Sequence, residues 1–489
     1  MTRVEAHEIR RAAVIGTGVR GLTIGHWTAA ALILAGGVVL RLVGTHGDLW
    51  LDEIWTLELL KPITSVGQIV WGINHDNNHY LNSFYLYLVG SDAPVMVQRG
   101  LSVFLGTAAV AAAGLAVLRS GWATVLAAIL LFAVAYPMVH YSSEARGYAG
   151  LLLFSLVALI FLQRELDRPD RINRQALGAA IGLGLLSHLT MAASAATLAA
   201  WAAWVAWNRT GRFREAEAMT RTIFRPALIW TAVIAAGILF GALRDGFILG
   251  GSDVFQAGHL VQGYGGFLRL LLGLPEQVPA WMCLAGAAAA VLLAAYFWRG
   301  REDFRGSLYA VSVIALPAAM FLAHLPNLQF GRYFLFSGAM FLLFVAEVLG
   351  LAWRKSGVFK AAAALALIAI VAGNAMSLRQ FFANGRGHYR DAVAEMAAAG
   401  PFTYATDSEF RVPMLVDFYS RRLNASARNV PQPDWCRERP DWMVIENPVI
   451  QRRGPELRVG AASCGTVYRL FKVFPAWGLS GSSWAVYRR

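Results

Sequence analysis

Eleven runs of roughly 20 apolar residues, separated by short polar segments, restrict this chain to one class of fold. A helix needs about 20 apolar residues to cross a bilayer. Hydrophobic residues make up 57% of the 489 residues and charged residues only 15%, with a mean hydropathy of +0.49. This composition differs from that of soluble domains. We therefore predict a polytopic α-helical membrane protein with about 11 spans, at 27–45, 95–118, 121–140, 147–163, 175–189, 191–207, 226–244, 280–298, 307–325, 331–352 and 359–378.

Basic residues alternate between the connecting segments in a way that predicts the orientation. They are concentrated in residues 1–26, around Arg119, and in 164–174, 209–225, 299–305 and 354–360. Because Lys and Arg favour cytoplasmic loops, we expect residues 1–26 to be a cytoplasmic tail. The arginines in this tail and the lack of a clear cleavage site favour a retained first span. The formal charge of +13 is thus read as a topology signal and not as a nucleic-acid surface.

The composition changes at Asn384, after the last apolar run. An odd number of spans places residues 384–489 outside the cytoplasm, after a membrane module at 27–383. The pattern predicts helices at 388–399 and 414–422 and strands at 402–405, 442–445, 467–473 and 484–487. Strands that alternate with helices indicate a small extracytoplasmic α/β domain.

The first outer loop, residues 46–94, is the most polar stretch near an apolar run. Asp52 and Glu53 lie between Trp50 and Trp55, and tryptophan favours the membrane interface. Acidic residues beside a bilayer are candidates for function. Asp52 could act as a general base with Glu53 beside it; alternatively, Asp52 caps an interfacial helix at 54–60. The apolar segment 80–90 is too short to cross, and we expect it to lie in the interface.

Three further outer segments carry candidate binding residues. Asp76 and His79, within the polar stretch 74–80, could contact a sugar or acceptor, could hold a divalent metal, or could form a solvated turn. Glu144 and Arg146 follow a span and could form a simple ion pair. Arg332, followed by Tyr333, opens another span; it could bind phosphate or anchor lipid headgroups. Within the long loop 245–279, we expect residues 263–274 to form a mobile outer segment with an interfacial helix at 267–274 that could gate a lipid-facing site.

The three cysteines do not form a metal motif. Cys283 lies in an apolar run, where packing is the simplest role. Cys436 and Cys464 lie in the C-terminal domain. If that domain is extracytoplasmic, we expect these two to form a disulfide.

These motifs, taken together, resemble those of the GT-C membrane glycosyltransferases that use polyprenyl-phosphate sugars, which include protein O-mannosyltransferases and lipid A aminoarabinose transferases. The resemblance is carried in order by 49–53, by 79–88 followed by Arg99, by 143–148 and by 331–333. It implies Asp52 as catalytic base, Glu53 as its neighbour in the sugar site, and Arg332 and Arg146 as donor-phosphate ligands. One departure is that 76–79 reads Asp-Asn-Asn-His where many members have His-Pro-Pro.

The resemblance and the residues predict a membrane glycosyltransferase. It would move a sugar from a polyprenyl-phosphate donor to an extracytoplasmic acceptor (lipid A, core or surface glycan, or protein) by inverting single displacement. We expect a multi-pass protein of the bacterial inner membrane whose partners are the donor, a lipid or glycan acceptor and membrane lipids. No cofactor is required by the sequence, and a divalent metal is left open. The alternatives are a transporter or flippase for a lipid-linked sugar, or a binding protein anchored by its spans.

Overall fold

The computed structural model describes residues 23–248, 250, 254–300, 304–446, 454–459 and 465–489. These residues form two compact units. Unit 1 comprises the described residues within Met1–Val43, Ile63–Val89 and Gln98–Ser377. Unit 2 comprises those within Gly44–Pro62, Gly90–Val97 and Leu378–Arg489.

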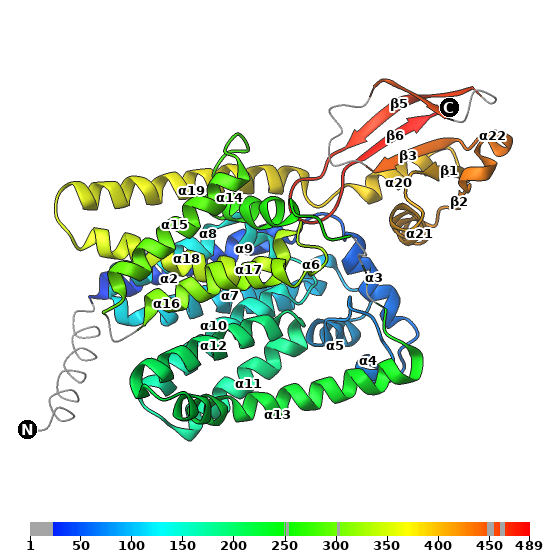
Figure 1. Ribbon diagram of the computed structural model, residues 1–489. Coiled ribbons are helices and arrows are strands. Elements are labelled where there is room, and N and C mark those ends of the chain that lie inside the picture. Colours follow the sequence, from blue (N-terminus) through cyan, green and yellow to red (C-terminus); the bar gives the residue numbers. More distant parts are fainter. Residues whose placement is uncertain (1–22, 249, 251–253, 301–303, 447–453, 460–464) are drawn as a thin grey trace, which may run out of the picture. The chain divides into compact units, whose positions relative to one another are not determined.

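Unit 1 consists of helices joined by short connections, and its long helices run side by side (Figure 1). The helices that lie in it or enter it are α2 (Ile24–Gly44), α4 (Gln68–Trp71), α5 (Tyr80–Val89), α6 (Val95–Gln98), α7 (Gly100–Ala116), α8 (Trp122–Val134), α9 (Tyr136–Tyr141), α10 (Tyr148–Asp167), α11 (Arg171–Ser187), α12 (Met191–Thr210), α13 (Phe213–Asp245), α14 (Gly266–Leu271), α15 (Ala280–Trp298), α16 (Arg305–Tyr309), α17 (Leu316–Leu322), α18 (Leu335–Trp353) and α19 (Val358–Asn384). Shorter helical turns are η1 (Leu118–Ser120), η2 (Val261–Gly265), η3 (Ala310–Ala315) and η4 (Gly331–Phe334).

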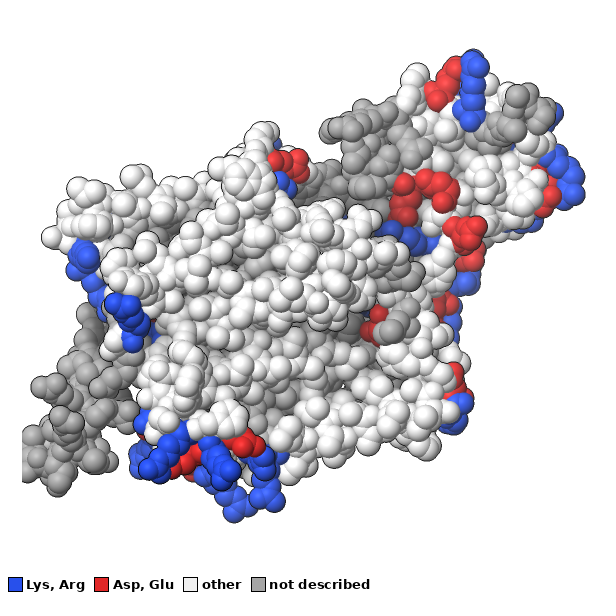
Figure 2. Space-filling view, in the orientation of Figure 1, with Lys and Arg blue, Asp and Glu red and all other residues white. Residues whose placement is uncertain are grey.

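Seven helical segments among the described residues are long and apolar enough to cross a membrane. Each of the eleven predicted spans coincides with helical structure, but α7 and α8 have only 17 and 13 residues. The helical class is therefore confirmed, and the count of eleven stays a prediction. In the apolar window of α13 only 11% of the residues are buried in the protein, as expected for a helix that faces lipid. Figure 2 shows a broad surface of unit 1 without charged side chains, which gather at the helix ends.

The break between α8 and α9 positions the segment that carries Glu144 and Arg146. Pro137 lies at the start of α9, and a proline cannot continue the hydrogen bonding of the preceding helix. The buried guanidinium of Arg41 donates to the backbone carbonyls of Phe132 at 3.0 Å and Ala133 at 3.3 Å, in the last turn of α8. A cation at a helix C-terminus is also favoured by the helix dipole. Arg41 thus stabilises the end of α8 inside the bundle.

Unit 2 is a mixed six-stranded sheet with helices, in the strand order β2-β1-β3-β6-β5-β4. β1 pairs in parallel with β2 and β3, whereas β3–β6, β6–β5 and β5–β4 are antiparallel. The predicted helices and strands of this region are all present, which confirms the small sheet domain; β2 and β4 were not predicted. The elements are α3 (Leu51–Leu60), α20 (Tyr389–Ala397), β1 (Phe402–Thr406), α21 (Arg411–Leu423), β2 (Ala427–Asn429), η5 (Gln432–Asp434), α22 (Trp435–Glu438), β3 (Trp442–Glu446), β4 (Glu456–Val459), β5 (Thr466–Phe474) and β6 (Trp484–Arg488).

Helix α3, from the first outer loop, packs on α21 within unit 2. The buried hydroxyl of Tyr419 donates to the carbonyl of Leu49 at 2.8 Å. Arg421 pairs with Glu58 at 2.6 Å. These contacts fix the segment that carries Asp52 and Glu53 against a helix more than 300 positions later in the chain.

Candidate functional site

Asp52 and Glu53 lie in the first turn of α3 and have different surroundings. Trp50 is the N-cap residue, and its backbone N–H donates to Glu53 Oε2 at 3.1 Å. The Glu53 side chain is fully buried, whereas Asp52 is half-buried. The alternative in which Asp52 caps this helix is therefore wrong, because the cap lies two residues earlier. Both carboxylates also benefit from the positive end of the helix dipole.

The polar stretch 74–80 of unit 1 is tied to the beginning of the long loop 245–279. The backbone N–H of Ile248 donates to the carbonyl of Asn74 at 2.9 Å, and the N–H of Gly250 donates to Asp76 Oδ1 at 3.0 Å. His75 Nδ1 lies 2.9 Å from the same carboxylate oxygen. Burial opposes ionisation of Asp76, but these two hydrogen bonds and the charge of Arg146 outweigh it and lower its pKa. Asp76 is therefore an ordered carboxylate.

His79 is buried among aromatic rings. Its ring stacks on His188 with centroids 4.6 Å apart and lies 5.8 Å from the ring of Tyr148. Burial, followed by the positive charges of Arg146 and Arg332 and the neighbouring His188, holds the pKa of His79 well below its ordinary value. The imidazole is thus neutral at physiological pH. Its Nε2 atom has no hydrogen-bond partner among the described residues.

Arg146 connects two of the predicted motifs. Its guanidinium donates to the side-chain oxygen of Asn77 and lies 5.7 Å from the ring centroid of Tyr148. The next residue, Gly147, is the N-cap of α10 and lies where the chain passes very close to α11. A Cβ at this position would overlap the carbonyl oxygen of Ser187 and lie 3.1 Å from Cγ of His79. Only glycine allows this approach, which brings Arg146 beside the polar stretch.

Glu144 and Arg332 belong to the same electrostatic environment. Glu144 is fully buried, with Oε1 2.8 Å from His140 Nε2. The charge of Arg332 acts on His79, which places this arginine within electrostatic range of the cluster. The Arg332 guanidinium also lies over the rings of Phe330 and Tyr333, at 4.5 and 5.7 Å from their centroids. Tyr333 is only partly buried.

The predicted residues thus divide between the units. Unit 1 brings Asp76, His79 and Arg146 together, with Glu144, Arg332 and Tyr333 in the same unit, while Asp52 and Glu53 belong to unit 2. No group of three or more His, Cys, Asp or Glu side chains that could hold a metal ion occurs among the described residues. Cys283 is free and buried, and Cys436 is disulfide-bonded. Cys464 lies outside the described residues, so the predicted pairing stays a prediction.

Two members of the unit 1 cluster could not be identified from the sequence. His188 looks isolated, because no other charged or titratable side chain lies near it in the chain and its partner His79 is more than 100 positions away. Asn77 lies in a recognised polar stretch, but nothing in the sequence indicates that it holds Arg146. Both depend on tertiary contacts.

No family model and no curated protein matches the sequence. The structure is similar to that of the Archaeoglobus fulgidus oligosaccharyltransferase tethered to an acceptor peptide with the NVT sequon, with a TM-score of 0.50, 12% identity, and coverage of 87% of this chain and 69% of that chain. The oligosaccharyltransferase AglB from Archaeoglobus fulgidus in complex with an inhibitory peptide and a dolichol-phosphate gives a TM-score of 0.49 at 12% identity, over 86% of this chain and 69% of that chain. ArnT from Cupriavidus metallidurans bound to undecaprenyl phosphate gives 0.48 at 13% identity, over 95% and 98%. The fold of this chain is therefore similar to that of GT-C membrane glycosyltransferases, as its motifs predicted.

Proposed function

We propose that this protein is a membrane glycosyltransferase that moves a sugar from a polyprenyl-phosphate donor to an extracytoplasmic acceptor. The observation that carries the proposal is the cluster of half-buried Asp76 with the buried Asn77, His79 and Arg146 in unit 1, within the electrostatic field of Arg332. Buried ionisable groups in a membrane protein are costly and mark functional sites. The donor is both anionic and strongly apolar, and unit 1 offers features for both parts.

The arginines suit the phosphate. Arg146 is only 6% exposed and is oriented by Asn77. A planar guanidinium can bind two phosphate oxygens at once. In a site with little water, such a group stabilises the negative charge that develops on the phosphate as its bond to the sugar breaks. Arg332 would supply the second positive charge.

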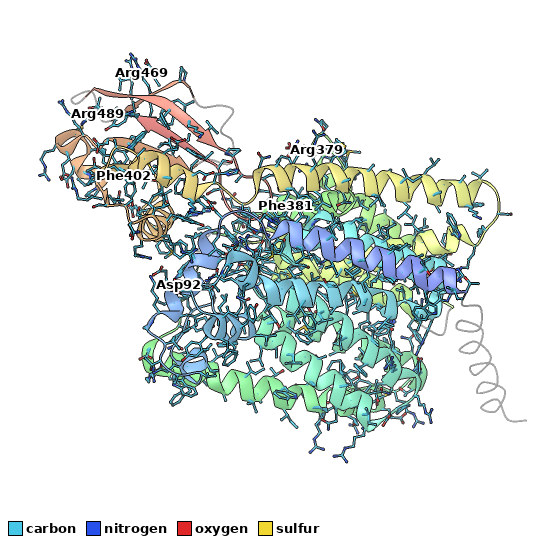
Figure 3. The ribbon with its side chains drawn as sticks, turned by 180° about the vertical axis from the view of Figure 1, so that it is seen from behind. Asp92, Arg379, Phe381, Phe402, Arg469 and Arg489 are labelled. Carbon is cyan, nitrogen blue, oxygen red and sulfur yellow. The ribbon has the colours of Figure 1, made fainter. Side chains whose placement is uncertain are left out.

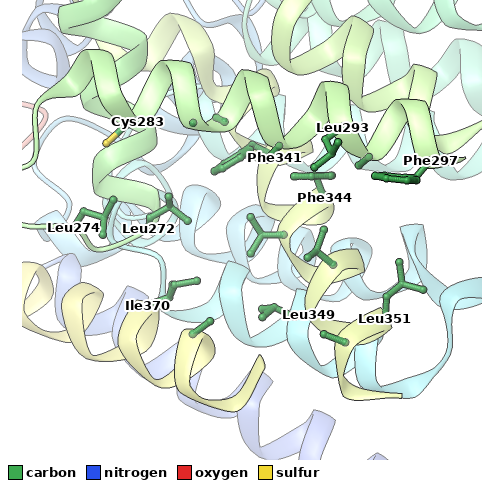
Figure 4. Close-up of a pocket in the computed structure, with 18 of the residues that line it drawn as sticks. Leu272, Leu274, Cys283, Leu293, Phe297, Phe341, Phe344, Leu349, Leu351 and Ile370 are labelled. Atoms are coloured by element: carbon green, nitrogen blue, oxygen red, sulfur yellow. The ribbon is translucent and has the colours of Figure 1, made fainter. Parts of the chain in front are cut away.

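An apolar cavity of about 820 Å³ in unit 1 suits the prenyl chain. Figure 4 shows its walls, with Leu293 and Phe297 on α15, Phe341 and Phe344 on α18, and Ile370 on α19. Burial of hydrocarbon in such a space is favourable in proportion to its area. A transferase with a polyprenyl-phosphate donor needs a lipid-compatible site of this kind.

The remaining residues have chemical roles in this proposal. The Asp76 carboxylate would accept hydrogen bonds from sugar hydroxyls, and the neutral Nε2 of His79 would take part in the same contacts, with Glu144 and Tyr333 nearby in unit 1. Asp52 would accept the proton of the acceptor hydroxyl while the oxygen of that hydroxyl forms a bond to the anomeric carbon of the donor sugar. The bond from that carbon to phosphate oxygen breaks, and the polyprenyl phosphate leaves with the electron pair. Configuration at the anomeric carbon is inverted.

The proposal is tested with purified protein in liposomes that contain polyprenyl phosphates carrying radiolabelled hexoses or pentoses. We expect release of polyprenyl phosphate and transfer of label to an envelope glycan or lipid fraction from the host cell. In the product, the anomeric carbon of the transferred sugar should have the inverted configuration by NMR. Movement of intact donor across the bilayer with no release of polyprenyl phosphate would support a transporter instead.

A further inference from the structure

Unit 2 contains a polar cavity whose lining residues have no role in the proposed transfer reaction. Its volume is about 560 Å³, within the roughly 300–1,000 Å³ range of small-molecule sites. Four segments of unit 2 form it: the segment before α3, the turn that carries Asp92 (Figure 3) with the first residue of α6, helix α20, and helix α21. The lining residues are Gly47, Asp48, Asp92, Val95, Arg390, Tyr419 and Arg422.

Hydrogen bonds within unit 2 hold several of these groups in place. Asp48 Oδ2 accepts from the backbone N–H of Arg390 at 2.7 Å. Arg422 donates through Nη2 to the carbonyl of Ser91 at 2.7 Å, and its guanidinium lies 4.3 Å from the ring centroid of Phe418. A binding site whose polar groups are already oriented loses less entropy when a ligand binds.

The charges of the lining select the kind of ligand. Two carboxylates, Asp48 and Asp92, face the same cavity as the side chains of Arg390 and Arg422. This balance disfavours a strongly anionic or strongly cationic ligand. A sugar hydroxyl both donates and accepts hydrogen bonds, so a neutral saccharide can satisfy carboxylates and guanidiniums together. Tyr419 also lines the cavity, but it is only 3% exposed, so the charged groups are the main contacts offered to a ligand.

We propose that this cavity binds the acceptor saccharide, and this inference rests on the proposed glycosyltransferase function. Asp48 lies four residues before Asp52 in the same unit. A chain of four residues spans at most about 14 Å, so a saccharide held at Asp48 lies near the candidate base. The acceptor is therefore a glycan or glycolipid whose neutral sugar portion occupies unit 2.

The test is saturation-transfer NMR of the full-length protein in lipid nanodiscs, because a detergent with a sugar headgroup would compete. The probes are neutral methyl hexosides and their disaccharides. Asp92→Asn and Arg422→Gln should each weaken binding about tenfold or more, the scale of a hydrogen bond to a charged group. Asp391→Asn is the matched control: it removes an exposed acid of α20 that does not line the cavity, and it should bind as wild type does.

A parallel transfer assay separates the two proposals. The cavity variants should raise the acceptor KM and leave the donor KM unchanged. If the wild type binds saccharides but releases no polyprenyl phosphate, the transferase function fails and the cavity stands as a saccharide site. If transfer occurs but neither variant changes saccharide binding or acceptor KM, the cavity proposal is overturned and the transferase function stands.

Discussion

Glu53 Oε2 accepts a hydrogen bond from the backbone N–H of Trp50, three residues earlier, at 3.1 Å. This contact satisfies a buried donor at the start of α3, which helices otherwise leave without a partner. It gives the two adjacent acids different roles. Glu53 is enclosed and fixes the helix start, whereas Asp52, one residue earlier, stays partly accessible.

Replacing Glu53 should therefore affect stability according to its hydrogen-bonding capacity. Glu53→Ala leaves the buried Trp50 N–H without this acceptor, and we expect a cost of about 1–3 kcal/mol and a lower Tm. Glu53→Gln retains an acceptor oxygen and should melt near wild type, with turnover impaired less than by changes at Asp52. Thermal unfolding of the two variants checks this; equal Tm values for Ala and Gln would contradict it.

The neutral state of His79 predicts a pH dependence of stability. Its pKa in the folded protein lies well below the ordinary value of 6.5. As pH falls through about 6.5, the unfolded chain takes up a proton that the folded chain does not, so stabilisation present above that pH is lost. The loss approaches about 1.4 kcal/mol per pH unit. The pKa of Asp76 is also lowered, but its protonation reduces stability only as the pH falls below the ordinary value of 3.8, outside this range.

Melting curves between pH 7.5 and 5 measure this effect. The His79→Gln variant cannot take up the proton and should show a shallower fall of Tm with acidity than wild type. His388→Gln, at a partly exposed site in unit 2, is the control for loss of a histidine. Parallel slopes for wild type and His79→Gln would show that this imidazole does not control the acid response.

Arg332 should affect donor use more than folding. Arg332→Ala removes a guanidinium whose charge reaches His79, and we expect a donor KM raised by at least about tenfold, the effect of losing one charge-assisted hydrogen bond. Arg332→Lys keeps the charge without the planar fork and should recover part of the activity. Initial rates against donor concentration measure both variants.

A matched control for this experiment is Arg269→Ala. Arg269 belongs to none of the candidate motifs. It lies in the long loop 245–279 and donates to the backbone carbonyls of Glu276 and Val278. Its loss should leave donor KM unchanged. If both alanine variants raise the donor KM equally, Arg332 does not bind the donor phosphate specifically and instead contacts lipid headgroups at the membrane surface.

Much of the fold could be predicted because local patterns determine it. The apolar runs coincide with helices, and the alternation in the C-terminal region gave helices α20 and α21 and four of the strands. β2 was missed because it has three residues, Ala427–Asn429, with no apolar alternation; it exists through pairing with β1. The break at Ala135 was not predicted, although Pro137 lies within the run 121–140, because the contact with the distant Arg41 is visible only in the structure.

The site was predictable as a set of motifs but not as a set of contacts. Polar residues are easily recognised in an apolar sequence, which is why Asp76, His79 and Arg146 were predicted as site residues. Their partners were not, because His188 and the Gly250 N–H come from distant segments. Similarly, the first outer loop gave no indication that α3 packs on α21, where Glu58 pairs with Arg421.

The strongest prediction concerns Asp52. Asp52→Asn keeps the size and the position in the first turn of α3 but removes the proton acceptor. If Asp52 is the general base, the variant should fold and bind donor normally and lose turnover by a factor of about 10² or more. Glu395→Gln is the control, since Glu395 is an exposed acid of the same unit that pairs with Lys472 and takes no part in holding α3. Stopped-time assays at saturating donor and acceptor measure turnover. Near-normal turnover of Asp52→Asn would assign proton removal to another acid, with Asp76 and Glu144 as the next candidates.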